Sequence, residues 1–166
     1  MFDNLNRMIS SMPLDQAMEK ASAAQRLGDK KSEALYRLLI AKMHLEEGSL
    51  DQCASEARAA IVIFRAIKNL IGEASCILIL AQSEYLRGNF SKAQADYETA
   101  LAIYNKSGDL TGEALTHLGL AAVHFDNPAR KDPSKVKEHL NKAMVIYQRL
   151  GDFQSQKSVM EMLKIC

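Results

Sequence analysis

An internal repeat of about 40 residues constrains this chain more than any other feature of its sequence. Three segments begin alike, as SEALYRLLIAKMHLEEG, GEASCILILAQSEYLRG and GEALTHLGLAAVHFDNP, and three end alike, as IVIFRAIKN, LAIYNKSGD and MVIYQRLGD. Aligning Glu33, Glu73 and Glu113 sets the period at 40 residues. Repeats of this length are typical of arrays in which each unit buries its apolar face against its neighbours.

The third copy carries an insertion. Aligning Ala60, Ala100 and Ala143 gives intervals of 40 and then 43 residues, and the three additional residues fall in the segment 126–134. This segment holds two of the three prolines of the chain, which indicates a loop, where insertions are tolerated. We therefore expect one domain over 1–166, made of a truncated first repeat at 1–27, repeats at 28–67, 68–107 and 108–150, and a capping helix at 151–166.

Each repeat predicts a helical hairpin. In the second copy Ala93, Tyr97 and Ala100 follow one another at spacings of four and three residues, which places them on one face of an α-helix. A glycine, Gly48 or Gly88, separates the two halves of the first two repeats, where a helix end favours positive φ. The residues expected to cap the first helices are Asp29, Asn69, Asp109 and Asp152. The expected helices span 2–10, 14–26, 29–47, 50–66, 69–87, 90–106, 109–125, 133–149 and 152–164.

Small residues recur at matching positions of the copies. They are Ala41, Ala81 and Ala121 in the first helices and Ala60, Ala100 and Ala143 in the second helices. Because so little side chain stands between the backbones there, two helices can approach closely. We expect all six alanines to be buried between helices.

The pattern resembles the tetratricopeptide repeat. The family motif has a large and then a small apolar residue in the first helix and Ala–x3–aromatic–x2–Ala in the second, which here reads LA at 80–81 followed by Ala93, Tyr97 and Ala100. The G-[DN]-x-x-G-E-A start and the long period look like the long-helix branch found in rapsyn-type and Pins-type scaffolds. The aromatic position of the other two copies departs from the motif and holds Ala57 and Leu140. The resemblance implies an all-α, right-handed superhelical solenoid of antiparallel helical hairpins.

Charge and cysteine content bear on partners and location. Lys and Arg number 21 and Asp and Glu 20, so a formal charge of +1 gives no reason to expect binding to nucleic acid or to an anionic membrane. The cysteines, Cys53, Cys76 and Cys166, are widely spaced and odd in number, which favours a reducing, cytoplasmic location over a disulfide framework. Neither a secretion signal nor an apolar run of membrane-spanning length is recognised.

No motif for catalysis or metal binding stands out. His44 and His124 occupy the same repeat position and His117 lies seven residues before His124, so none of these pairs has the i, i+4 spacing of a helical metal site. We expect Cys53 and Cys76 to be inert packing thiols. The sequence therefore predicts a protein that is not an enzyme and that uses no metal or cofactor.

The first helices of such a stack are expected to line its inner curve. Taking Ala41 as directed into the core, residues rotated by roughly 60–120° from it face that curve. They are mostly apolar, which favours a groove for a partner helix or peptide, and the alternative is that neighbouring helices bury them. The candidate binding residues are Leu35, Leu38, Lys42, Ile71, Leu78, Ile79, Gln82, Leu115, Leu118 and Ala122.

Two functions are compatible with this pattern. The first is a protein–protein interaction module, an adaptor or scaffold that binds a partner helix or peptide in the groove. The alternative is a self-assembling unit, in which a second copy covers the groove or the apolar stripe from Phe2 to Met12. Family members that clamp carboxylates of chaperone tails use Lys, Arg and Asn at the groove positions, so the leucines here argue against that ligand.

Overall fold

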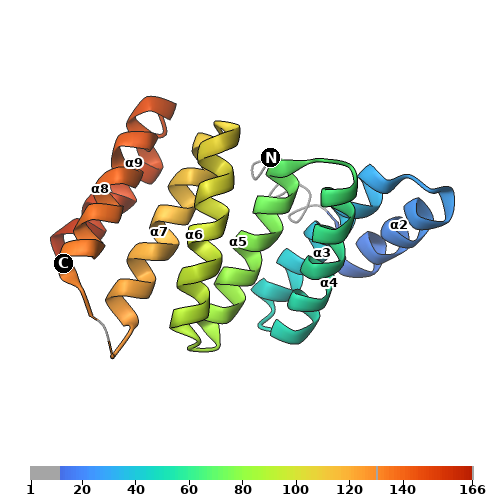
Figure 1. The fold of residues 1–166 in the computed structure, drawn as a ribbon, viewed down its shortest axis with the longest axis horizontal. Helices are drawn as coiled ribbons and strands as arrows, with labels where there is room; N and C mark the ends of the chain where they lie inside the picture. Colours follow the sequence, from blue (N-terminus) through green and yellow to red (C-terminus); the bar gives the residue numbers. More distant parts are fainter. Residues whose placement is uncertain (1–11, 130, 166) are drawn as a thin grey trace.

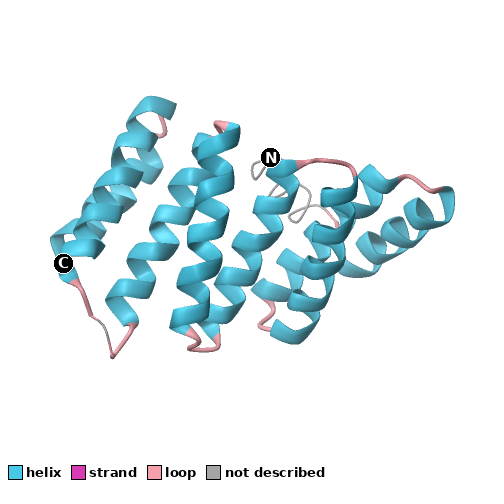
Figure 2. Ribbon diagram, viewed as in Figure 1, coloured by secondary structure: helices cyan, strands magenta, loops and turns pink. Residues whose placement is uncertain are grey.

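The computed structural model describes residues 12–129 and 131–165, and the helix expected at 2–10 lies outside this part of the chain. The described residues form eight α-helices and no strand. Figure 2 shows the helices and the short loops that join them. The helices are α2 (Leu14–Leu27), α3 (Lys30–Glu46), α4 (Leu50–Ala66), α5 (Leu70–Leu86), α6 (Phe90–Ser107), α7 (Leu110–Asp126), α8 (Pro133–Leu150) and α9 (Phe153–Ile165). The all-α prediction is confirmed, and each expected helix within this range agrees with the structure to one residue at either end.

Helices that follow one another in the chain pack together, and the hairpins lie side by side in chain order from α2 to α9 (Figure 1). We call α3, α5, α7 and α9 the first helices and α2, α4, α6 and α8 the second helices. Beyond the hairpin contacts, α3 packs on α5 and α5 packs on α7, whereas the second helices make no comparable contacts with one another among the described residues. The first helices α3, α5 and α7 are therefore more closely spaced than the second helices.

Side-chain caps start the first helices as the sequence predicts. The carboxylates of Asp29, Asp109 and Asp152 each accept a hydrogen bond from the backbone N–H of the residue three positions later, at 2.9 to 3.1 Å. The amide oxygen of Asn69 does the same for Gly72 at 2.9 Å. These bonds satisfy backbone donors that have no partner inside the helix. The four predicted caps are confirmed.

The six repeated alanines are all buried, which confirms the expected close contacts. A second device brings the hairpins together: an aromatic ring near the end of one second helix lies on a glycine in the following first helix. A Cβ atom added to Gly72 would stand 2.4 Å from the ring of Phe64, and one added to Gly112 would stand 2.3 Å from the ring of Tyr104. Glycine at these positions allows each ring to lie against the helix backbone.

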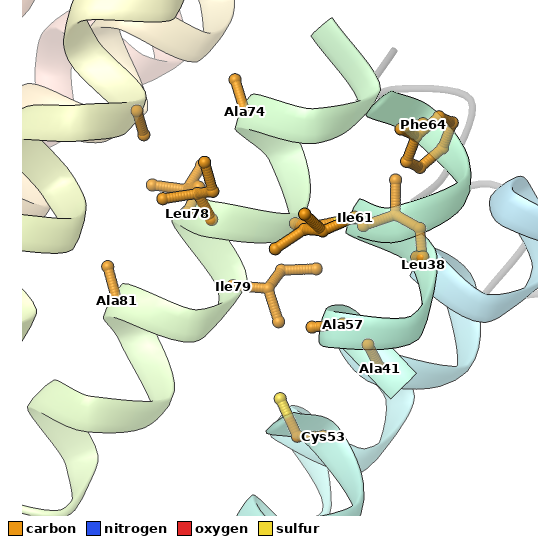
Figure 3. Packing of buried hydrophobic residues seen from close by; sticks show 14 of the residues in the cluster. Leu38, Ala41, Cys53, Ala57, Ile61, Phe64, Ala74, Leu78, Ile79 and Ala81 are labelled. Atoms are coloured by element: carbon orange, nitrogen blue, oxygen red, sulfur yellow. The ribbon is translucent and has the colours of Figure 1, made fainter. Parts of the chain in front are cut away.

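The buried side chains form two clusters. The larger one runs from α2 through α6 and reaches α7, and Figure 3 shows part of it between α3, α4 and α5. The smaller one lies between α7, α8 and α9, around Val136, Leu140 and Val159. Cys53 and Cys76 are buried in the larger cluster, where burial raises the pKa of the Cys53 thiol to about 11 and that of Cys76 still further. Both thiols therefore stay protonated, as expected of packing residues.

Candidate functional site

Three of the predicted groove residues belong to the core instead. Leu38, Leu78 and Ile79 are 0 to 1% exposed, so the interpretation that they line an open groove is wrong. Figure 3 shows Ile79 of α5 pointing toward Ala57 of α4. The physical reason is the direct packing of α3 on α5 and of α5 on α7, which covers the apolar sides of these helices.

Five further candidates lie at the margin of the core. Leu35, Ile71 and Leu115 are half-buried and pack against the larger cluster, so they expose only part of their surface. Lys42 and Gln82 are also half-buried. Burial lowers the pKa of Lys42 below its ordinary value, and a carboxylate oxygen of Glu46 lies 4.0 Å from its ammonium nitrogen. These residues do not form an open apolar groove.

Leu118 and Ala122 line an almost wholly apolar hollow, whereas Ile71 borders a separate hollow together with polar residues such as Lys68 and Asn69. Leu118 and Ala122 face a pocket of about 280 Å³ between α7, α8 and α9, which we call the α7–α9 pocket. Apart from Asp126 its lining is apolar, and it consists of Leu118, Ala121, Ala122, Phe125, Asp126, Val136, Leu140, Met162 and Ile165. The structure thus brings two predicted residues together with side chains from two other helices.

The pocket forms because α9 is not packed closely on α7, the preceding first helix. The earlier first helices pack on one another, but α9 packs on α8 and makes no comparable contact with α7. The residue at the position of Lys42 and Gln82 is alanine at 122, so little side chain fills the space between the two helices. Widened spacing and a small residue together leave the hollow.

Large apolar side chains at the rim remain accessible. Phe125 is 45% exposed, Met162 is 44% exposed and Ile165 is 77% exposed. Lone exposed apolar residues are common on proteins, but several around one apolar pocket mark a surface that another molecule can cover.

The polar residue in the pocket lining is Asp126. The hydroxyl of Tyr85 donates a hydrogen bond to a carboxylate oxygen of Asp126, which joins α5 to the end of α7. Burial, with the Asp126 carboxylate as a further cause, raises the pKa of Tyr85 to about 12. The ammonium of Lys131, from the loop insertion, lies 5.8 Å from the centre of the Phe125 ring. These contacts fix the rim and leave the interior apolar.

Sequence reasoning missed the contributions of α8 and α9. Ile165 follows Ala122 by 43 residues, the interval that separates the third repeat from the next unit, so extending the repeat register would have found it. Met162 likewise takes the position of Leu39, Ile79 and Gly119. Val136 and Leu140 were expected only as core residues of their helix. Their place in the pocket follows from the position of α9, which the repeat pattern does not specify.

The α7–α9 pocket can bind an apolar surface, and its lining offers no pair of titratable groups for acid–base chemistry. In the part of the chain that the structure describes, no cluster of three or more ligating side chains is placed to hold a metal ion, and no helix is both long and apolar enough to cross a bilayer. Comparison with known proteins gives no family assignment: no family model matches the sequence, and neither does any curated protein.

Proposed function

We propose that this protein is a non-enzymatic interaction module that binds an apolar helix or peptide segment of another protein at the α7–α9 pocket. The single observation that carries the proposal is the apolar lining of that pocket together with the exposure of Phe125, Met162 and Ile165 at its rim. An amphipathic helix can place one or two large apolar side chains into a hollow of this size and rest its remaining apolar face on the rim.

The arrangement of the helices supports placing this pocket on an inner curve. In a curved stack the elements on the inside lie closer together than those on the outside, and here α3, α5 and α7 form the closer layer, of which α7 lines the pocket. This is what the right-handed solenoid of tetratricopeptide-like hairpins requires of its first helices, and that family assignment is part of the proposal. The buried free thiols of Cys53 and Cys76 are compatible with the reducing, cytoplasmic location that we propose.

The test uses one substitution in the pocket and one matched control. Ala122→Asp places a carboxylate in the apolar lining, and Ala102→Asp places the same group on the exposed side of the second helix α6. A displayed library of amphipathic helical peptides is selected against the unmodified chain, and the affinity of selected peptides is measured by isothermal titration for all three proteins. We expect Ala122→Asp to weaken binding at least about tenfold, since a desolvated carboxylate faces the peptide, and Ala102→Asp to leave it unchanged.

The second candidate function is self-assembly. Its support is the exposure of large apolar side chains at both ends of the stack, with Leu27 of α2 at 84% and Phe153 of α9 at 80%. Mass measured by light scattering over a hundredfold dilution separates the two functions. If Ala122→Asp dissociates a dimer and Ala102→Asp does not, the pocket binds a second copy of the chain. If the chain is a monomer at all concentrations, the pocket is left to a different protein.

A further inference from the structure

Three of the four histidines of this chain meet between α7 and α8. The Nδ1 atoms of His117 and His139 are 3.0 Å apart, and the ring of His124 stacks on that of His139 with centroids 5.7 Å apart and planes 7° apart. His139 is thus the middle member of a continuous row. His117 and His124 are buried and His139 is half-buried.

The close contact in this row is incompatible with protonation of both of its rings. Two Nδ1 atoms at 3.0 Å form a hydrogen bond when one of them carries a proton and the other offers its lone pair. If both rings are protonated, two N–H groups and two positive charges face each other. Protonation of His124 and His139 together likewise stacks two cations. The contacts of the row are therefore lost when neighbouring rings are protonated together.

The surroundings also disfavour charge on these rings. Burial is the largest cause for each ring and lowers the pKa of all three, that of His117 to about 4. The charged groups that act on them are Glu98 from α6, Asp132 from the loop, and Lys135, Glu138 and Lys142 from α8. Glu138, the carboxylate that acts on all three rings, is already paired with Lys142 at 2.6 Å. The nearby carboxylates thus offset little of the energetic cost of burying a protonated imidazole.

The row also adjoins the α7–α9 pocket. His117 and Leu118 are consecutive in α7, His139 and Leu140 are consecutive in α8, and each leucine lines the pocket. His124 itself lines a smaller hollow of about 120 Å³ that shares Phe125, Val136 and Ile165 with the pocket. A change in the packing of α7 on α8 therefore changes the walls of the candidate binding site.

From this juxtaposition we propose that His117, His124 and His139 form a proton-sensitive row, which holds α7 against α8 while neutral and loosens this hairpin and the α7–α9 pocket on acidification. The conformational part stands on the row alone. The consequence for binding rests on the function proposed above, and it is regulation of that same site.

The sign of the effect follows from linkage. Between the ordinary histidine pKa of 6.5 and the lowered native values, the unfolded chain binds protons that the native chain does not, so stability falls as the pH falls. At pH 5.5 each histidine held neutral in the native state lowers the folding equilibrium constant by about tenfold relative to pH 7.5. Above pH 7 the row is neutral in both states and the effect disappears.

The first measurement follows unfolding by urea between pH 7.5 and pH 5. His139→Phe keeps a ring of similar size but removes the Nδ1 contact with His117 and the titratable group that stacks on His124. His44→Asn removes one histidine from α3, away from the row. We expect His139→Phe to reduce the loss of stability between pH 7.5 and 5.5 by at least tenfold in the equilibrium constant, and His44→Asn to retain most of the loss. Equal pH dependence in the unmodified chain and in His139→Phe would overturn the proposal.

The second measurement needs no binding partner and follows the pocket directly. The chain contains no tryptophan, so Phe125→Trp provides a single fluorescent reporter at the rim of the pocket. We expect its emission maximum to shift to longer wavelength between pH 6.5 and pH 5, and this shift to be absent when His139→Phe is added. NMR titration gives the pKa of each imidazole in the unmodified chain. This check does not depend on whether the variants fold. Three rings that titrate together near pH 6.5 would contradict the proposal, whatever the outcome of the peptide-binding test.

Discussion

The ring of Tyr104 lies so close over Gly112 that a Cβ atom at 112 would stand 2.3 Å from ring carbon Cε1. Tyr104 is fully buried, and its hydroxyl contacts the hydroxyl of Ser75 in α5 at 3.2 Å. One residue at the end of α6 therefore touches two first helices. The tyrosine fixes how closely α5 and α7 approach each other, and the glycine makes that approach possible.

The substitution Gly112→Ala tests this contact through the sign of its effect. In an unobstructed helix the change stabilises by up to about 1 kcal/mol, because alanine is the better helix former. Here we expect destabilisation by about 1–3 kcal/mol, since the buried ring has to move. Urea unfolding measures the difference. Adding Tyr104→Leu should make the glycine substitution less harmful than it is alone, and strict additivity of the two changes would refute the contact.

Leu78→Asp and Ala122→Asp should separate core from pocket. Leu78 is 1% exposed, so an aspartate there is desolvated without a partner, and we expect a loss of about 4 kcal/mol or more in the free energy of unfolding. Ala122 lines an open pocket where water can reach a carboxylate, so its variant should keep the helical content and most of the thermal stability. Circular dichroism with thermal melting compares the two. A folded, stable Leu78→Asp protein would show that the first helices do not pack as described.

Asp152→Ala should loosen α9 in particular. The Asp152 carboxylate accepts from the backbone N–H and the hydroxyl of Ser155, and removal of such a cap costs about 1 kcal/mol. Because α9 packs mainly on α8, we expect faster amide hydrogen exchange in 153–165 with little change in α3 to α6. The serine hydrogen bonds hold the pKa of Asp152 below its ordinary value, so the same loosening should appear in the unmodified chain as the pH falls below about 3.8. Uniform exchange changes over all helices would contradict this.

Glu84→Gln should change stability in a different pH range from the histidines. Glu84 is 6% exposed and accepts hydrogen bonds from Lys92 at 2.5 Å and from Asn89 at 2.8 Å, and these partners lower its pKa. A lowered carboxyl pKa contributes stability above the ordinary value of 4.5 that is lost as the pH falls through the native value. We expect the variant to be about 1 kcal/mol less stable at pH 7, with the difference vanishing near pH 3. Chemical denaturation at both pH values measures it, and a difference that persists in acid would mean that packing, not charge, is responsible.

The parts of the fold that were predictable are those set by local sequence. Their effect extends over only a few residues, as with the capping aspartate Asp109, the buried alanine Ala100 and the glycine turns. Each of these features also recurs in more than one copy of the repeat. Helix ends were therefore correct to one residue. The burial of Leu78 depends instead on the distance between α5 and its neighbouring first helices, and helical periodicity does not contain that distance.

The histidine row shows the same limit from another direction. His117 and His124 were considered as candidates along one helix, where their spacing gives no site, and His139 belongs to a different repeat half 22 residues after His117. The three rings meet only because α7 packs on α8 in one particular register. The alanines of that interface predicted the packing, but a shift by one helical turn would separate the rings.

The position of α9 has a consequence for how arrays of this kind can change in length. At three matching repeat positions α7 carries Ala114, Leu118 and Ala121. The residues of α9 at these positions are charged and exposed: they are Lys157, Glu161 and Lys164. A hairpin appended after α9 would set its apolar side against these charges, whereas a duplicated unit inserted between existing hairpins would meet alanine and leucine on both sides. Duplication between existing hairpins would therefore preserve the match of apolar faces, and the pocket beside α9 would keep its walls.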